Sequence, residues 1–157
     1  MVLEVGSKAP DFEGKSDRGI NIKLYDLLKS SEVVLYFYPK DSTPGCTAEA
    51  CSFRDNWEDI TKTGATVIGV STDSLESHKK FRDHYSLPFD LISDPEYRIG
   101  KMFGLRGLLI KPRVTFVIDR NGIIRHVYES QLNARNHVKE ALSALKMIRG
   151  NENAGSS

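Results

Sequence analysis

YFYPKDSTPGCTAEACSFR, residues 36–54, is the stretch that decides the fold. It starts in an apolar segment, crosses a turn rich in Pro and Gly, and continues into a helical pattern. A strand that runs through a short turn into a helix is typical of an α/β domain. The first turn of that helix holds Cys46, and Cys51 follows five residues later.

Outside this stretch, short apolar segments rich in β-branched and aromatic residues predict further strands. The four predicted strands are Glu32 to Tyr38, Ala65 to Ser71, Val114 to Asp119 and Ile123 to Tyr128. Asn121-Gly122, between the last two, is the strongest short signal for a hairpin and makes that pair antiparallel. The segment Asp11 to Leu28 is expected to add an N-terminal hairpin, with its turn at Asp17-Arg18-Gly19 and a short helix at Tyr25 to Leu28.

Helical patterns lie between and after the strands. They cover about Thr47 to Thr61, Ser74 to Tyr85 and Ala134 to Ile148. The last has an apolar face that should cover the sheet. This order predicts an α/β, thioredoxin-like fold: a mixed central sheet flanked by helices, with the N-terminal β-hairpin as an extension.

A single domain is expected over residues 1–149, because a chain of 157 residues suits one hydrophobic core. The polar segment GNENAGSS, residues 150–157, predicts a disordered tail. The net charge of +1 offers no field to attract nucleic acid or an acidic membrane. The start of the chain lacks a signal-peptide pattern, and no apolar run is long enough for a membrane span, so a cytoplasmic protein is expected.

Two cysteines are too few for the disulfide framework of a small secreted domain, and in a reducing compartment such a pair is more often reactive or metal-binding. At the start of a helix, Cys46 would meet unpaired backbone N–H groups and the positive end of the helix dipole, which favour the thiolate. The Thr43 hydroxyl can sit beside the sulfur. Pro39 and Pro44 restrict the turn, and Gly45 allows a substrate to approach the backbone closely.

The spacing of the two cysteines conflicts with a permanent disulfide. In an ideal helix, Cys46 and Cys51 would be separated by roughly 7.5 Å along the axis alone. A disulfide usually joins Cα atoms about 4.4 to 6.8 Å apart. A bridge between them therefore requires the helix to unwind locally, as expected of a transient bridge formed during turnover.

The motif PxxxTxxC, formed by Pro39, Thr43 and Cys46, is the active-site pattern of peroxiredoxins. The segment CTAEACSFRD, residues 46–55, closely resembles the Q-type subfamily of bacterioferritin comigratory proteins. The resemblance extends over nearly the whole chain, through GSKAPDF at residues 6–12, VIGVS at 67–71 and RVTFVID at 113–119.

This resemblance implies a thiol-dependent peroxidase that reduces hydrogen peroxide and organic hydroperoxides. Cys46 would become a sulfenic acid, Cys51 would resolve it as an intrachain disulfide, and a thioredoxin-like dithiol protein would reduce the bridge. No metal, haem or flavin cofactor is required, because sulfur carries the oxidising equivalent. A monomer is expected, since the resolving thiol lies in the same chain.

The resemblance also implies roles for further residues. Arg113 would reach the peroxidatic sulfur and stabilise negative charge on the peroxide oxygens. Pro39 would shield the sulfur, Thr43 would contact the peroxide and Glu49 would orient neighbouring polar groups. The chain departs from the commoner pattern at residues 108–112, LLIKP, which leaves the shape of that loop open.

Other interpretations remain beside this one. The four histidines, at positions 78, 84, 126 and 137, show no metal-ligand spacing and are expected to be solvated surface residues. A hydrolytic Cys–His pair is an alternative, although the motif offers an arginine and a threonine rather than a general base. A thioredoxin-type oxidoreductase normally needs CxxC spacing. A redox-sensing or chaperone-like binding module could use the same disulfide switch without rapid turnover.

Overall fold

The computed structural model describes residues 2–106 and 111–155. Within these ranges a seven-stranded sheet forms the centre, in the order β2-β1-β5-β4-β3-β6-β7. The strands are β1 (Glu13–Ser16), β2 (Asn21–Lys23), β3 (Val33–Phe37), β4 (Thr66–Ser71), β5 (Asp90–Ser93), β6 (Val114–Ile118) and β7 (Ile124–Glu129). The helices are α1 (Leu24–Leu27), α2 (Pro44–Asp55), α3 (Trp57–Lys62), α4 (Leu75–Tyr85), α5 (Arg98–Met102) and α6 (Ala134–Gly155).

The sheet is mixed, as the sequence predicts. Strands β3, β4 and β5 run parallel to one another, while β6 pairs antiparallel with β3 and β7 pairs antiparallel with β6. The N-terminal hairpin of β1 and β2 joins the other edge through β5. Its turn includes Gly19, whose positive φ of 81° suits a residue without a side chain. The α/β fold with its N-terminal hairpin is therefore confirmed.

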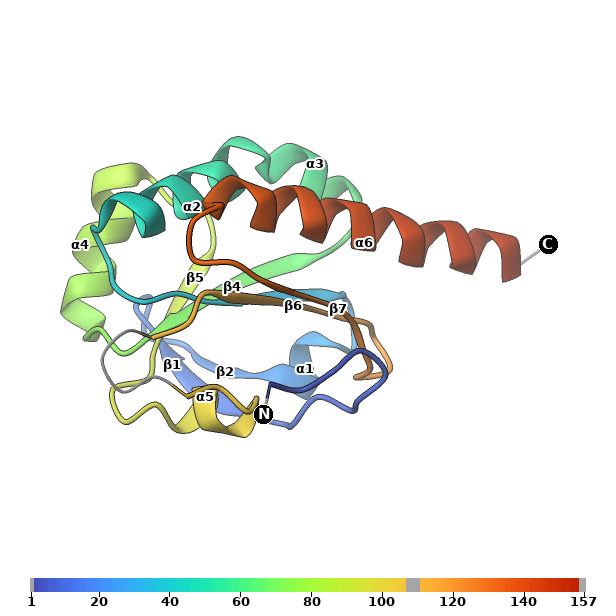
Figure 1. Ribbon diagram of the computed structural model, residues 1–157, viewed down its shortest axis with the longest axis horizontal. Coiled ribbons are helices and arrows are strands. Elements are labelled where there is room, and N and C mark those ends of the chain that lie inside the picture. The colour runs from blue at the N-terminus through green and yellow to red at the C-terminus, as the bar shows by residue number, and fades with distance from the viewer. Residues whose placement is uncertain (1, 107–110, 156–157) are drawn as a thin grey trace.

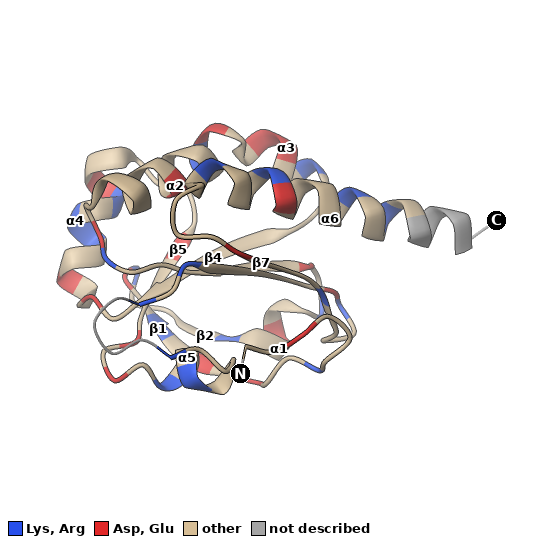
Figure 2. Ribbon diagram, viewed as in Figure 1, with Lys and Arg blue, Asp and Glu red and all other residues tan. Residues whose placement is uncertain are grey.

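Helices cover both faces of this sheet (Figure 1). Helices α2, α3, α4 and α6 lie on one face, and α1 and α5 lie on the other. Acidic and basic residues are both spread over the two layers (Figure 2), in keeping with the small net charge. In the part of the chain that the structure describes, no helix is both long and apolar enough to cross a membrane.

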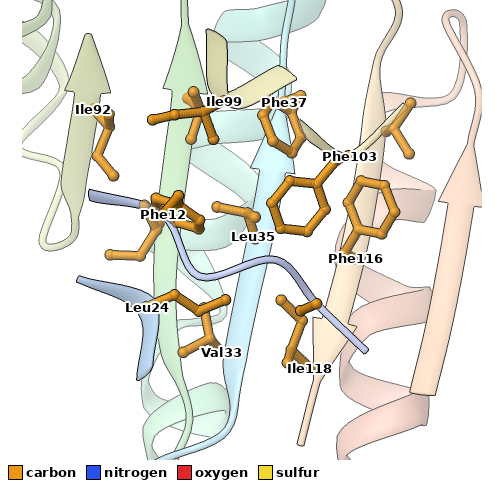
Figure 3. Close-up of a cluster of buried hydrophobic side chains, with 14 of the residues drawn as sticks. Phe12, Leu24, Val33, Leu35, Phe37, Ile92, Ile99, Phe103, Phe116 and Ile118 are labelled. Atoms are coloured by element: carbon orange, nitrogen blue, oxygen red, sulfur yellow. The ribbon is translucent and has the colours of Figure 1, made fainter. Parts of the chain in front are cut away.

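Strand β3 explains how one short segment organises two cores. Its side chains alternate between the faces of the sheet. Leu35 and Phe37 join the core under α1 and α5 (Figure 3), whereas Tyr36 faces the core under α2. The Tyr36 ring stacks on Phe53 of α2 with 4.7 Å between ring centroids. This aromatic run therefore places one of its rings beneath the helix that carries Cys46.

Three features differ from the sequence-based expectations. The helix expected over Thr47 to Thr61 is two helices, α2 and α3, because the backbone leaves helical geometry at Asn56 (φ −102°, ψ 12°). Strand β5 and helix α5 were not predicted, since segments of four and five residues are too short to show a period. Helix α6 continues to Gly155, past the expected end at Ile148 and into the segment for which a disordered tail is predicted.

Candidate active site

The turn between β3 and α2 places Cys46 in the first turn of a helix. Thr43 is the N-cap, and its extended backbone (φ −81°, ψ 155°) follows from the proline after it, which disfavours the helical region. Pro44 then starts the helix, where its missing N–H costs nothing. Cys46 is buried, with only 1% of its surface exposed. Its thiol therefore sits at the positive end of the helix, shielded from bulk water.

Arg113, the residue just before β6, is the polar partner of this sulfur. Its Nη2 donates to Cys46 Sγ at 3.4 Å, and its Nη1 donates to Glu49 Oε1 at 2.6 Å. Its Nε donates to the backbone carbonyl of Gln131 at 3.4 Å. The guanidinium is thus held on three sides and presents a fixed positive charge to the sulfur.

Gly45 provides the room for that arginine. A Cβ atom at this position would lie 2.9 Å from Arg113 Nη2, closer than side chains tolerate. The sequence predicts a close approach of a substrate at Gly45, and in the structure the guanidinium of Arg113 is the group that lies against this glycine.

Glu49 lies one helical turn after Cys46 and is completely buried. Burial raises the pKa of Glu49 to about 8, although the charge and hydrogen bond of Arg113 oppose the rise. Its Oε1 is bonded to Arg113, while its Oε2 makes no hydrogen bond and lies 3.5 Å from Nδ1 of His137. Glu49 thus orients Arg113 and can hold a proton close to neutral pH.

The other predicted site residues lie around this centre. The Thr43 hydroxyl donates to the carbonyl of Lys40 at 2.9 Å, so it braces the turn. Pro39 is half-buried where β3 ends, and Pro44 is exposed. Cys51 is half-buried and, like Cys46, a free thiol. Since α2 runs unbroken from Pro44 to Asp55, both cysteines share one intact helix, and a bridge between them requires that helix to open.

The expectation of four surface histidines is wrong for two of them. His78 and His137 are completely buried, and both hydrogen-bond to backbone carbonyls with Nε2. A carbonyl only accepts, so Nε2 carries a proton in each ring. Local periodicity could not reveal this, because the groups that receive these imidazoles come from other elements.

A buried cluster around His78 anchors the loop that leads to Cys46. His78 Nδ1 lies 2.7 Å from Asp41 Oδ2, and Tyr38 donates its hydroxyl to Asp41 Oδ1 at 2.6 Å. The backbone N–H of Asp41 donates to Asp73 Oδ2 at 2.8 Å. Asp41, Asp73 and His78 bring ligand-type atoms within 4.8 Å of one another, but the His78–Asp41 hydrogen bond already satisfies the two groups as an ion pair.

This pair makes stability depend on pH. Burial alone would lower the pKa of His78, but the hydrogen bond and charge of Asp41 outweigh it and raise the pKa above 6.5. A raised pKa in the folded state stabilises the fold below the unfolded value, and this contribution is lost as the pH rises through the folded value. We expect His78→Leu to lower the free energy of unfolding by about 3 to 5 kcal/mol at neutral pH, because Asp41 is left buried without its cation, and the deficit should shrink as the pH rises through the folded-state pKa of His78.

Denaturant unfolding at pH values on both sides of neutrality measures this difference. His84→Leu is the matched control, because His84 is exposed on the same helix and should change stability little. A deficit for His78→Leu that keeps growing from neutral to alkaline pH would contradict the assignment of a charged His78.

The segment at residues 108–112, where the chain departs from the commoner pattern, is only partly described. Residues 108–110 lie outside the described residues. Lys111 places its ammonium over the ring of Tyr97, 4.8 Å from the centroid, and Gln131 donates its side-chain amide to the Lys111 carbonyl at 2.9 Å.

The chain is similar in sequence to proteins of a known family. Residues 5–127 match the model of the AhpC/TSA family. The chain is 44% identical to peroxiredoxin Bcp of Bacillus subtilis, over 93% of this chain and 97% of that protein. It is also 44% identical to the chloroplastic peroxiredoxin Q of Arabidopsis thaliana, over 90% of this chain and 66% of the relative.

Solved structures agree with these relatives. Peroxidoxin BcpB of Mycobacterium tuberculosis superimposes with a TM-score of 0.88 at 36% identity, covering 93% of this chain and 98% of that one. The bacterioferritin comigratory protein of Xanthomonas campestris, described for its alkyl peroxide reduction activity, superimposes with a TM-score of 0.81 at 29% identity, covering 94% and 98% of the two chains.

Proposed function

Because the chain belongs to the AhpC/TSA family and, within it, to the Bcp and Q-type peroxiredoxins, we propose that Cys46 is the peroxidatic cysteine of its thiol peroxidase reaction. The observation that carries this proposal is the 3.4 Å contact between Arg113 Nη2 and Cys46 Sγ at the start of a helix. A helix N-terminus and a guanidinium both favour a thiolate, which is the nucleophilic form of cysteine.

In the first step, the Cys46 thiolate attacks one peroxide oxygen and the O–O bond breaks. The electron pair of that bond leaves with the other oxygen, which takes up a proton and departs as water or an alcohol. Cys46 is oxidised to a sulfenic acid, the reversible first stage of cysteine oxidation. Arg113 stabilises the negative charge that develops on the oxygens, and Glu49 holds the guanidinium in place.

In the second step, α2 opens and the Cys51 sulfur attacks the Cys46 sulfenic acid. A disulfide forms and the oxygen leaves as water. Opening α2 also withdraws Glu49 from Arg113, because Glu49 lies between the two cysteines. The ion pair therefore favours the folded helix until oxidation has made the disulfide possible.

We propose a thioredoxin-like dithiol protein as the reductant, since thiol–disulfide exchange returns both cysteines to thiols. Hydrogen peroxide and organic hydroperoxides are the proposed substrates. A monomer suffices for this cycle, because both thiols belong to one chain. Recycling needs a reducing compartment, for which we propose the cytoplasm.

A steady-state assay with a thioredoxin system and several peroxides tests this function. Cys51→Ser should react with the first equivalent of peroxide at the wild-type rate, because Cys46 and Arg113 are unchanged. It should then recycle slowly with a protein dithiol, because no intrachain disulfide forms. Intact-mass and peptide analysis after peroxide treatment should show a Cys46–Cys51 bridge in the wild type. Absence of that bridge would argue against Cys51 as the resolving residue.

A further inference from the structure

His137 is a buried polar residue beside the site, and the reaction above does not use it. It lies in the first turns of α6, the helix beside α2 (Figure 1). Its Nε2 is 2.8 Å from the carbonyl of Ser130, and its Nδ1 is 2.7 Å from Thr115 Oγ1. The ring also packs edge-on against Tyr128, with 4.7 Å between centroids. Both nitrogens are therefore bonded, and the ring is packed against Tyr128.

The protonation state follows from these partners. Ser130 accepts through its carbonyl, so Nε2 carries the proton. Burial lowers the pKa of His137 to about 4, and the positive charge of Arg113 adds to this effect. The ring is thus neutral near pH 7, and Nδ1 accepts from the Thr115 hydroxyl. A neutral imidazole can stand beside Arg113 without repelling it.

Two sets of contacts, called routes below, connect this ring to Arg113. The first runs through Glu49, whose unbonded Oε2 faces Nδ1 at 3.5 Å while its Oε1 holds Arg113. The second runs through the backbone: His137 fixes the carbonyl of Ser130, and the next carbonyl, that of Gln131, accepts from Arg113 Nε at 3.4 Å. The N–H of Ser130 also donates to the Arg113 carbonyl at 3.3 Å.

We propose that His137 is a positioning residue that holds the Arg113 guanidinium against Cys46 by fixing the Ser130–Gln131 backbone and by packing beside the Glu49 carboxyl group. The proposal rests on Cys46 and Arg113 acting as described above. Only the first route depends on α2. When α2 opens and Glu49 withdraws, the backbone route from α6 keeps Arg113 oriented for the return of the thiolate.

Substitutions at position 137 can separate the two routes. The amide of Gln reaches the position of Nε2 and can still donate to Ser130, whereas the shorter amide of Asn ends near the position of Nδ1. His137→Leu removes both functions. His126→Gln is the matched control, because His126 is part-exposed on β7 and pairs with Glu140 at 2.7 Å, outside this network.

Two measurements report on the site independently of stability. One is the second-order rate constant for hydrogen peroxide in a single turnover, and the other is the pH midpoint of Cys46 alkylation by iodoacetamide in Cys51→Ser protein. We expect His137→Leu to lower the rate constant by about tenfold to a hundredfold, because small displacements of a positioned group cost this much. The alkylation midpoint should move to higher pH. His137→Asn should resemble Leu, while His137→Gln and the control should stay close to wild type.

A double-mutant cycle tests whether the effect passes through Arg113. An Arg113→Lys background lacks the planar guanidinium group. In this background, His137→Asn should lower the second-order rate constant by less than threefold. An unchanged rate constant and midpoint in folded His137→Asn protein would overturn the proposal, and so would an equal loss with and without Arg113. If His137→Leu fails to fold, the comparison of the Asn and Gln variants tests the proposal. Failure of the peroxidase assignment itself is distinguishable, because Cys46→Ser would then retain activity.

Discussion

Replacing Cys46 with Ser is expected to reduce peroxide consumption to the uncatalysed background. A serine hydroxyl stays protonated near neutral pH, even at a helix N-terminus beside a guanidinium, and its oxygen cannot carry the oxidising equivalent that sulfur accepts. The substitution replaces one buried atom by a slightly smaller one, so the fold should persist. The measurement is peroxide loss with a thioredoxin system, together with thermal unfolding of the same sample.

The control for this experiment is Cys51→Ser, which also removes one thiol. It should consume one equivalent of peroxide, whereas Cys46→Ser should consume none. If Cys46→Ser reduced peroxide at the wild-type rate, the peroxidatic residue would have to lie elsewhere and the proposed mechanism would fail.

Replacing Arg113 with Ala is expected to damage both catalysis and stability. Loss of one preorganised donor at a developing negative charge costs about 10² to 10³ in rate. In alkaline solution the free energy of unfolding should fall by about 3 to 5 kcal/mol, because a charged Glu49 is then left buried without its cation. Stopped-flow kinetics with hydrogen peroxide and denaturant unfolding measure the two effects separately.

The stability loss in Arg113→Ala should depend on pH in a defined direction. The pKa of Glu49 is raised to about 8 even beside Arg113, and removal of the cation raises it further. A carboxyl with a raised folded-state pKa stabilises the fold below its unfolded value of 4.5, and this contribution is lost as the pH rises. The deficit of Arg113→Ala should therefore be small in acid and largest in alkaline solution.

The double variant Arg113→Ala with Glu49→Gln is the control for this interpretation. It removes the uncompensated carboxylate, so it should recover much of the stability and flatten the pH dependence, while the rate stays low. If the double variant regained wild-type reactivity, Arg113 would have no direct role at the sulfur.

Much of the architecture could be predicted from local pattern. The alternation of apolar segments with helical periods established an α/β domain, and Asn121-Gly122 identified the antiparallel pair of β6 and β7. Strand β5 could not be predicted, because its four residues are recognisable as a strand only once β1 and β4 lie on either side. Short elements owe their conformation to their neighbours.

For the candidate site, too, local sequence predicts one part and leaves another part open. Pro44 and the helical pattern after it place Cys46 at a helix start, since proline favours the first helical turn and disfavours later ones. The resemblance to known peroxiredoxins indicated Arg113 and Glu49. The contact between these two residues could not be predicted from local sequence, because they are 64 positions apart in the chain and no local spacing connects them.

The sequence by itself thus determined which thiol starts a helix and that an intact helix keeps the two cysteines from a relaxed bridge. Only the tertiary structure decided which polar groups are buried around that thiol: His78 beside Asp41, and His137 beside Glu49 and Arg113. The physical reason is that helix caps and periods depend on neighbours in sequence, whereas desolvation and charge pairing depend on whatever the fold brings within a few ångströms.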